Sequence, residues 1–209
     1  MRRLYELELV ALAALATPLV LTNLGNMAIG LVDIAIIGRL GGAEIAAAGL
    51  GNAIFFLVAI FGMGLMFGLD PLIAQAVGAG ELRNARRLLW QGLWLAALVT
   101  VPLSVAVLAL GEQLHRLEVT PEVAELTRTY LYARLPSLLP FLALMASRAY
   151  LQAHGHTRSL IAAVIVANLV NLPIAIALSF GYEPLGIPAL GIAGAGLATA
   201  LATAVQLAV

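Results

Sequence analysis

The residue best suited to chemistry is Asp33, a carboxylate in the otherwise apolar stretch 17–41 (TPLVLTNLGNMAIGLVDIAIIGRLG). An ionised acid at the centre of a membrane-spanning helix costs about 2.5–3.5 kcal/mol. Thr22, Asn26 and Gly30 precede it at steps of four, four and three residues. Because this spacing places all four residues on one helix face, the sequence predicts a polar face turned toward protein or water. Asp33 is then a candidate to bind a cation or a proton.

Polar residues recur at steps of three and four on three further apolar segments. These stripes comprise Tyr130, Arg134 and Ser137, then Asn168, Asn171, Ala175 and Ser179, and finally Thr199, Thr203 and Gln206. Since one polar stripe on each of four helices needs a common polar environment, we expect a shared hydrated interior. Hydrogen bonds between packed helices are the alternative explanation for the Asn and Thr residues.

The charge of Asp33 depends on where Arg134 points, because both residues fall toward the outer half of the bilayer. An ion pair between them would hold the carboxylate in its charged form. If the cavity is dry and Arg134 points away, the carboxyl group can take up and release a proton. The sequence leaves both arrangements open.

Asp70 is the second acid within an apolar segment, and it directly precedes Pro71. It either caps a helix segment that restarts at the proline or takes part in transport. We interpret His115, His154 and His156 as solvated loop residues rather than metal ligands. The sequence has no HExxH motif, phosphate-binding glycine loop or Ser/His/Asp set, and no cysteine. We therefore expect neither an enzyme nor a cofactor.

The composition is that of an integral membrane protein. The 209 residues are 62% hydrophobic and 11% charged, whereas soluble domains have about 45–50% apolar and about 25% charged residues. The net charge of +0 gives no basic field for nucleic acid.

A membrane span needs about 20 apolar residues, and six such segments can be delimited. The predicted helices, in an all-α six-helix bundle, are residues 9–37, 45–77, 88–110, 126–146, 160–180 and 190–209. The arginines outside the helix centres fall mostly on one side of this arrangement: Arg2, Arg3, Arg83, Arg86, Arg87, Arg148 and Arg158. By the positive-inside rule, we expect a cytoplasmic N-terminus in the cell membrane.

Four segments together resemble multidrug and toxic compound extrusion (MATE) transporters. They are residues 18–41 with Pro18 and Asp33, 68–92 (GLDPLIAQAVGAGELRNARRLLWQG), 147–159 (SRAYLQAHGHTRS) and 167–200 (ANLVNLPIAIALSFGYEPLGIPALGIAGAGLATA). They follow the family order over nearly the whole chain. The resemblance implies a twelve-helix transporter of two six-helix lobes, with residues 1–209 as the N-terminal lobe.

The resemblance also implies a role for particular residues. Such transporters export drugs and organic cations in exchange for H⁺ or Na⁺. Asp33 matches the cation-coupling acid of the first helix, and Pro18 matches the proline where that helix bends. Asn168, Asn171 and Thr199 match polar positions of the same lobe, and Thr22, Asn26, Tyr130, Arg134 and Thr203 are expected to line its cavity.

One position departs from the family pattern, because Leu172 stands before Pro173 where some members carry an acid. A Na⁺ site at Asp33 would then have a single carboxylate, which favours H⁺ as the coupling ion. Two alternatives stay open. A related flippase for lipid-linked precursors would line its cavity with several arginines, whereas Arg134 is the best candidate here. A non-transporting half, which would need a second lobe or a second copy, is consistent with an apolar stretch that runs to Val209.

Overall fold

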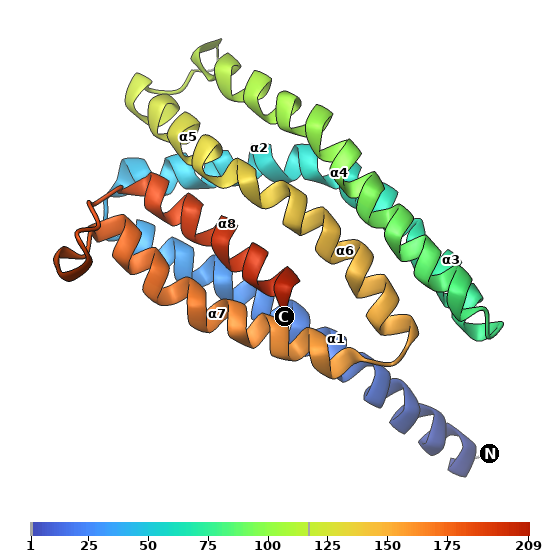
Figure 1. Cartoon of the computed structure of the whole chain (residues 1–209). Coiled ribbons are helices and arrows are strands. Elements are labelled where there is room, and N and C mark those ends of the chain that lie inside the picture. Colours follow the sequence, from blue (N-terminus) through green and yellow to red (C-terminus); the bar gives the residue numbers. More distant parts are fainter. Residues whose placement is uncertain (1, 117) are drawn as a thin grey trace.

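The computed structural model describes residues 17, 20–116 and 118–209 in full, and the regular structure among them is helical (Figure 1). The elements are α1 (Arg2–Ile37), α2 (Gly42–Phe67), α3 (Leu69–Gly78), α4 (Leu82–Glu112), η1 (Gln113–Arg116), α5 (Pro121–Arg134), η2 (Leu135–Ser137), α6 (Leu138–Ala153), α7 (Thr157–Phe180), η3 (Glu183–Leu185) and α8 (Ile192–Ala208). The predicted all-α fold class is confirmed.

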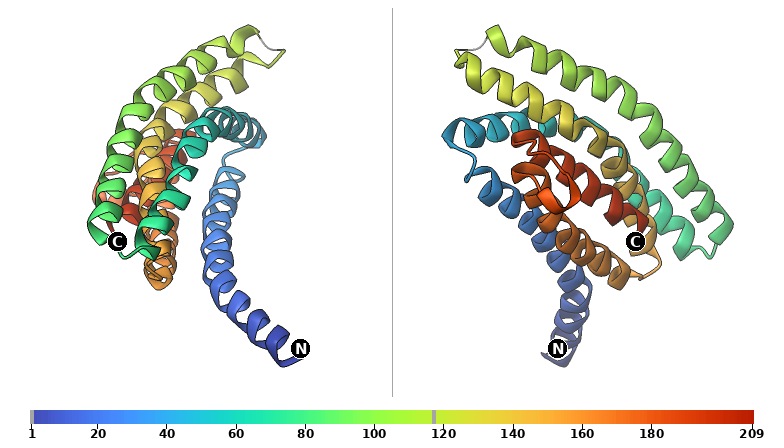
Figure 2. Two further views of the ribbon diagram at one scale, coloured as in Figure 1. Left: turned by 90° about the vertical axis from the view of Figure 1, so that its right-hand side faces the viewer. Right: turned by 60° about the vertical axis from the view of Figure 1, so that its left-hand side comes forward.

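The helices form two layers. One layer contains α1, α7 and α8, and the other contains α2 to α6, as the two views of Figure 2 show. The larger layer packs around Phe55, Met66, Ile73 and Leu142, all of which are buried. Small residues dominate the contact among α1, α7 and α8, where Ala175 and Ala198 are fully buried. These side chains let the helix backbones approach closely.

Four stretches of the described residues are long and apolar enough to cross a membrane: Val20–Ile37, Gly42–Gly78, Leu82–Arg116 and Thr157–Phe180. The apolar helix α8 is shorter. The predicted segments 160–180 and 190–209 agree with α7 and α8 to within three residues.

Two predicted helices are interrupted, and proline accounts for both breaks. The predicted helix 45–77 divides at Gly68 into α2 and α3, since Pro71 has no N–H to donate to the Phe67 carbonyl. The predicted helix 126–146 begins earlier, at Pro121, and ends later, at Ala153. The 3₁₀ segment η2 separates α5 from α6, because Pro136 cannot donate to the Tyr132 carbonyl.

The end of α7 is fixed to the start of α8 through the backbone. Gly181 follows α7 with φ +82°, a left-handed conformation that favours glycine. After the turn, Leu190 N–H donates to the Leu178 carbonyl at 2.8 Å and Gly191 N–H donates to Ser179 at 3.1 Å. Gly194 then lies directly against the Leu178 backbone. This contact determines the position of α8 relative to α7.

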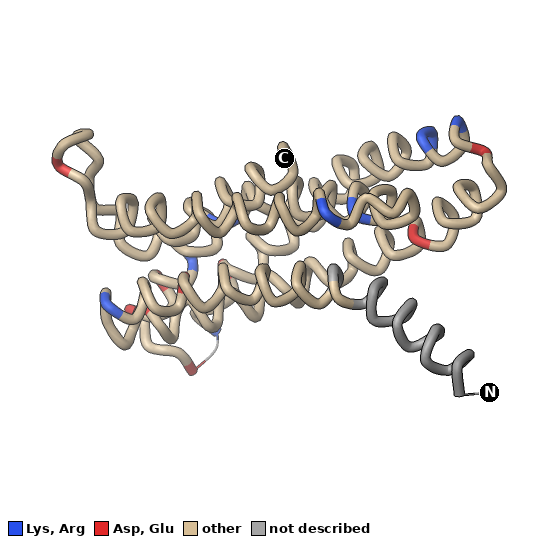
Figure 3. The backbone as a smooth tube through the Cα atoms, turned by 90° about the horizontal axis from the view of Figure 1, so that it is seen from below, with Lys and Arg blue, Asp and Glu red and all other residues tan. Residues whose placement is uncertain are grey.

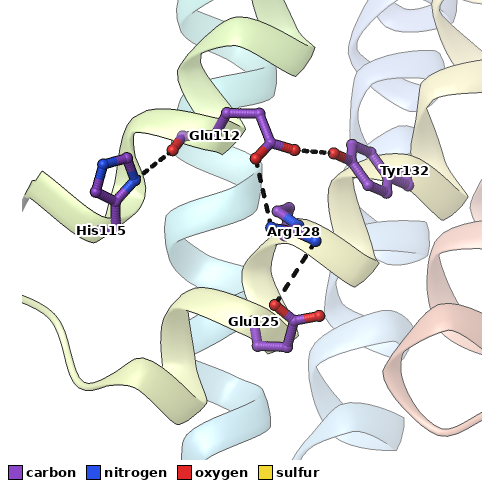
Figure 4. Close-up of polar contacts among 5 residues, drawn as sticks. All are labelled: Glu112, His115, Glu125, Arg128 and Tyr132. Atoms are coloured by element: carbon purple, nitrogen blue, oxygen red, sulfur yellow. Dashed lines mark hydrogen bonds and ion pairs between the residues drawn. The ribbon is translucent and has the colours of Figure 1, made fainter.

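Charged residues concentrate at the ends of the bundle (Figure 3). The turns before α4 and α7 lie at one end, where these helices start with Arg83, Arg86, Arg87 and Arg158 (Figure 1). The opposite end has residues of both signs. At that end Glu112 accepts hydrogen bonds from Tyr132 and from Arg128 (3.4 Å), and Arg128 also pairs with Glu125 at 3.9 Å (Figure 4). These side chains are exposed and lie outside the cavity described next.

Candidate functional site

A cavity of ≈ 670 Å³ lies between the two helix layers. Its walls come from α1 and α8 on one side and from α2, α5 and α6 on the other. Six predicted residues line it: Asn26, Asp33, Tyr130, Arg134, Thr199 and Thr203. Phe56, Phe67 and Phe141 provide an aromatic surface. The volume and the mixture of aromatic and polar side chains are typical of sites for drug-sized molecules.

Asp33 is 5% exposed and is held by donors from the two neighbouring helices. Thr199 of α8 donates its hydroxyl to Oδ2 at 2.6 Å, and Asn171 of α7 donates its side-chain amide to Oδ1 at 3.4 Å. The stripes that the sequence places on three separate helices therefore meet at one carboxyl group. Since α1, α7 and α8 all contribute, a change in the charge of Asp33 acts on the packing of this whole layer.

Arg134 makes no ion pair with Asp33 within 4.0 Å in the described structure. Its Nη1 donates to the Tyr130 hydroxyl at 2.6 Å, and its guanidinium lies 4.7 Å from the ring centroid of Phe55 and 5.7 Å from that of Phe56. The structure matches neither arrangement in full, because no direct ion pair forms and yet Arg134 lines the same cavity as Asp33 instead of pointing away from it. Cation–π contacts with α2 take the place of the ion pair.

Asn168 and Thr22, which were also predicted, do not line this cavity, and Asn26 lies where it meets a smaller one. Asn168 donates its side-chain amide to the Gly25 carbonyl at 2.9 Å, so it holds α7 against α1 about two turns away from Asp33. Thr22 lines a smaller cavity of ≈ 50 Å³. Asn26 borders both cavities and accepts a hydrogen bond from Gln206 at 3.1 Å. Pro18 lies outside the described residues, so its bend stays a prediction.

Asp70 does not cap a helix, because the residue before α3 is Gly68 and no side chain caps it. Asp70 instead lies in the first turn of α3, with Oδ2 3.8 Å from Arg148 Nη2. The placement of Arg148 corrects the sequence analysis, which put this residue in a turn. It lies inside α6 and lines the cavity, which therefore contains two arginines.

A periodic signal for Arg148 exists in the sequence. Phe141, Leu144, Met145 and Arg148 follow one another at helical steps, and all four line the cavity. Asn52 of α2 also lines the cavity and was missed. A single amide among small and aromatic residues carries no stripe that could have indicated it.

Comparison with known proteins places this architecture in a family. The family model MatE matches residues 18–177. A "Probable multidrug resistance protein NorM" from Bradyrhizobium diazoefficiens is 38% identical over 194 residues, which are 93% of this chain and 41% of that protein. The "Multidrug resistance protein NorM" of Aliivibrio fischeri is 30% identical, over 94% of this chain and 42% of its own length. The chain thus spans less than half the length of these relatives.

Solved structures agree on the fold. The eukaryotic MATE transporter AtDTX14 superposes with a TM-score of 0.84 at 19% identity, covering 94% of this chain and 43% of that one. An outward-facing MATE family transporter of the MOP superfamily gives a TM-score of 0.82 at 22% identity, over 95% of this chain and 43% of its own. The two helix layers are therefore arranged as in these structures, and the family-model match over residues 18–177 shows that the chain belongs to the MatE family.

Proposed function

We propose that this chain forms the cargo-binding half of a multidrug exporter, driven by exchange against H⁺. The proposal rests on the position of Asp33. This residue lies on the wall of the ≈ 670 Å³ cavity, is hydrogen-bonded to two further helices and is not paired with Arg134. A carboxyl group in that position can change charge without breaking an ion pair. The cargo comprises drugs, in keeping with the names of the relatives, and organic cations, as the family resemblance implies.

The mechanism follows from which groups hold Asp33. While the carboxylate is charged, the Thr199 hydroxyl and the Asn171 amide both donate to it and hold α1 against α7 and α8. When a proton binds, one carboxyl oxygen becomes a donor and these hydrogen bonds must rearrange. Loosening of α1 changes the wall that α1 contributes to the cavity. Proton binding and cargo binding then alternate in one conformational cycle.

The oxygen ligands available at Asp33 favour H⁺ over Na⁺ as the coupling ion. Hard cations prefer several oxygen ligands, usually including more than one carboxylate. Among the described residues, Asp33 is the only carboxylate that lines the cavity, and Leu172 rather than an acid precedes Pro173. Proton exchange requires only the one carboxyl group that is present.

The test is dye export from proteoliposomes with an imposed pH gradient or an imposed Na⁺ gradient. Wild type should export ethidium when the pH gradient is present, and Asp33→Asn should not, although it inserts to the same extent. Glu183→Gln, which removes an exposed acid on η3, is the matched control. Wild-type export by Asp33→Asn would refute the role of Asp33. Export driven by Na⁺ at a clamped pH would refute the choice of H⁺.

We further propose that a second six-helix unit, either a second copy of this chain or a second lobe, closes the cavity. The lining residues Met27 and Ile34 are 67% and 57% exposed, and Phe56 is 44% exposed. The chain covers 41–42% of the length of its relatives, so a second unit of similar size would complete their length and could cover these residues. Reconstituted chain alone should export dye only where light scattering finds a dimer. Export by a demonstrated monomer would contradict the proposal.

A flippase for lipid-linked precursors is a second candidate, and the two arginines in the cavity favour it. Vesicles with a fluorescent lipid diphosphate in one leaflet distinguish the two functions. The exporter function predicts that this chain, with or without its partner, leaves the rate of lipid transfer at the protein-free value.

A further inference from the structure

Two arginines line the cavity among the described residues, and Arg148 is the one of them that remains open to a ligand. Its side chain is 24% exposed, whereas Arg134 is 9% exposed and already donates to Tyr130. Arg148 also borders both the ≈ 670 Å³ cavity and the adjoining ≈ 50 Å³ cavity. The guanidinium rests 5.6 Å from the ring centroid of Phe67, which holds it at the cavity wall.

The hydrogen-bonding capacity of Arg148 is largely unused. A guanidinium has five N–H donors, and its Nε is buried with no partner in the described structure. The nearest acid is Asp70, with 3.8 Å between Arg148 Nη2 and Asp70 Oδ2. This distance exceeds the 2.7–3.2 Å of a hydrogen bond, so the pair is a loose ion pair. One carboxylate oxygen, Asp70 Oδ1, is likewise buried without a partner.

The surroundings of Arg148 favour an anion over a cation. Its polar neighbours in the smaller cavity are the amides of Asn23, Gln152 and Gln206. Asp33 is the only acid among the lining residues of both cavities, and both of its oxygens are hydrogen-bonded to the opposite wall. Asn26, which borders Arg148, lies seven residues before Asp33 on α1, which corresponds to about 10 Å along the helix. Among the described residues, the loosely paired Asp70 is therefore the one acid close enough to oppose the positive charge of Arg148.

We propose that Arg148 binds an oxyanion, a carboxylate or a phosphate, carried by an aromatic or otherwise amphipathic cargo molecule. The planar guanidinium can donate two parallel hydrogen bonds to such a group. Phe67 supports the guanidinium, and Phe56 and Phe141 contact the apolar body of the cargo. Asp70 competes with the oxyanion for Arg148 and is displaced when the cargo binds. This inference rests on the proposed function in one respect, that the cavity is the cargo site.

Equilibrium binding to the full chain in detergent micelles tests the inference without any turnover. The probe is 1-pyrenebutyrate, and its methyl ester is the matched neutral ligand. Arg148→Gln should weaken binding of the acid by about tenfold or more, the effect of losing a charge-assisted hydrogen bond, and leave binding of the ester unchanged. The affinity of Arg148→Lys for the acid should lie between those of wild type and Arg148→Gln, because lysine keeps the charge but not the paired donors. Arg86→Gln, which alters an exposed arginine on α4, should bind both ligands as wild type does.

Asp70→Asn should change the affinity for the acid in the opposite direction. This variant tests whether the ion pair between Arg148 and Asp70 is only structural. If Asp70 competes with the ligand, this variant should bind the acid more tightly while its affinity for the ester stays the same. Competition by dihexanoyl phosphatidate would assign the oxyanion to a lipid headgroup, and the lack of such competition would assign it to soluble cargo; both support the site. Equal wild-type affinity for acid and ester, or weaker acid binding by Asp70→Asn, would overturn it. Loss of ethidium export in Asp33→Asn tests the proposed function separately, because equilibrium binding of the probe does not require proton-coupled transport.

Discussion

Gly194→Ala should separate α8 from α7 and thereby disturb Asp33 from a distance. A Cβ atom at this position would lie 2.3 Å from the Leu178 carbonyl oxygen and 2.6 Å from the Ser179 nitrogen. Ordinary contact begins at 3.4 Å, so the helices must move apart by about 1 Å, because backbone atoms cannot change rotamer to relieve a clash. Thr199 lies further along α8, and its 2.6 Å hydrogen bond to Asp33 would lengthen with that movement.

The effect of Gly194→Ala on the free energy of unfolding has two contributions of opposite sign. Alanine favours helix over glycine by about 0.5–1 kcal/mol, whereas overpacking costs typically about 1–3 kcal/mol. Because the clash here involves backbone on the facing helix, we expect the second term to prevail and the variant to be less stable by about 1–2 kcal/mol. Proton-coupled export should fall together with stability.

The matched control is Gly64→Ala in α2, where an added Cβ has no atom within 4 Å. It should be neutral or slightly stabilised, since only the helix preference changes. Thermal unfolding of both purified variants in the same detergent, followed by dye export in proteoliposomes, gives the comparison. If Gly194→Ala unfolds at the wild-type temperature and exports at the wild-type rate, the close α7–α8 contact does not position Thr199 as argued.

Three further predictions concern single groups. Thr199→Val should reduce ethidium export by about tenfold or more because it removes a buried hydrogen bond to a charged group, whereas Thr199→Ser should keep most of it; equal export by the two variants would contradict the role of the hydroxyl. Arg128→Gln should change the free energy of unfolding by less than about 1 kcal/mol, since its ion partners are exposed, and a larger loss in a denaturant titration would show that this cluster is structural. The chain has no cysteine, so single-cysteine variants report topology: an impermeant maleimide should label Glu183→Cys but not Glu81→Cys in intact cells, and the reverse pattern would invert the predicted orientation.

The sequence was most informative where polar residues repeat on apolar helices. The spacing of Asn171 and Thr199 placed them on helix faces that needed a polar partner, and the structure brings both to Asp33. Apolar segments such as α7, which continues through Pro173, and α8 were delimited to within a few residues. These inferences succeed because helical periodicity and the cost of burying polar groups act locally.

The direction of Arg134 and the place of Arg148 required the tertiary structure. Arg134 could pair with Asp33 or stack on aromatic rings. Which of the two contacts forms depends on Phe55 of α2, which is distant in sequence. Arg148 was assigned to the turn between the predicted helices 126–146 and 160–180, two residues beyond the end of the first. A long arginine side chain tolerates a helical position when its guanidinium reaches a polar cavity. No local pattern reports whether such a cavity exists.

The 3₁₀ segment between α5 and α6 has a mechanical consequence for the two arginines. Pro136 and Pro140 both lack an N–H, so the carbonyls of Tyr132 and Pro136 have no α-helical donor. The long arm that carries Arg134 before this segment and Arg148 after it therefore has a compliant joint between them, with fewer hydrogen bonds to resist bending. Bending at the joint would alter the distance between the two positive charges, and it would shift α5 against α8 and α6 against α4, which pack together. We propose that one cavity can in this way accommodate molecules of different lengths.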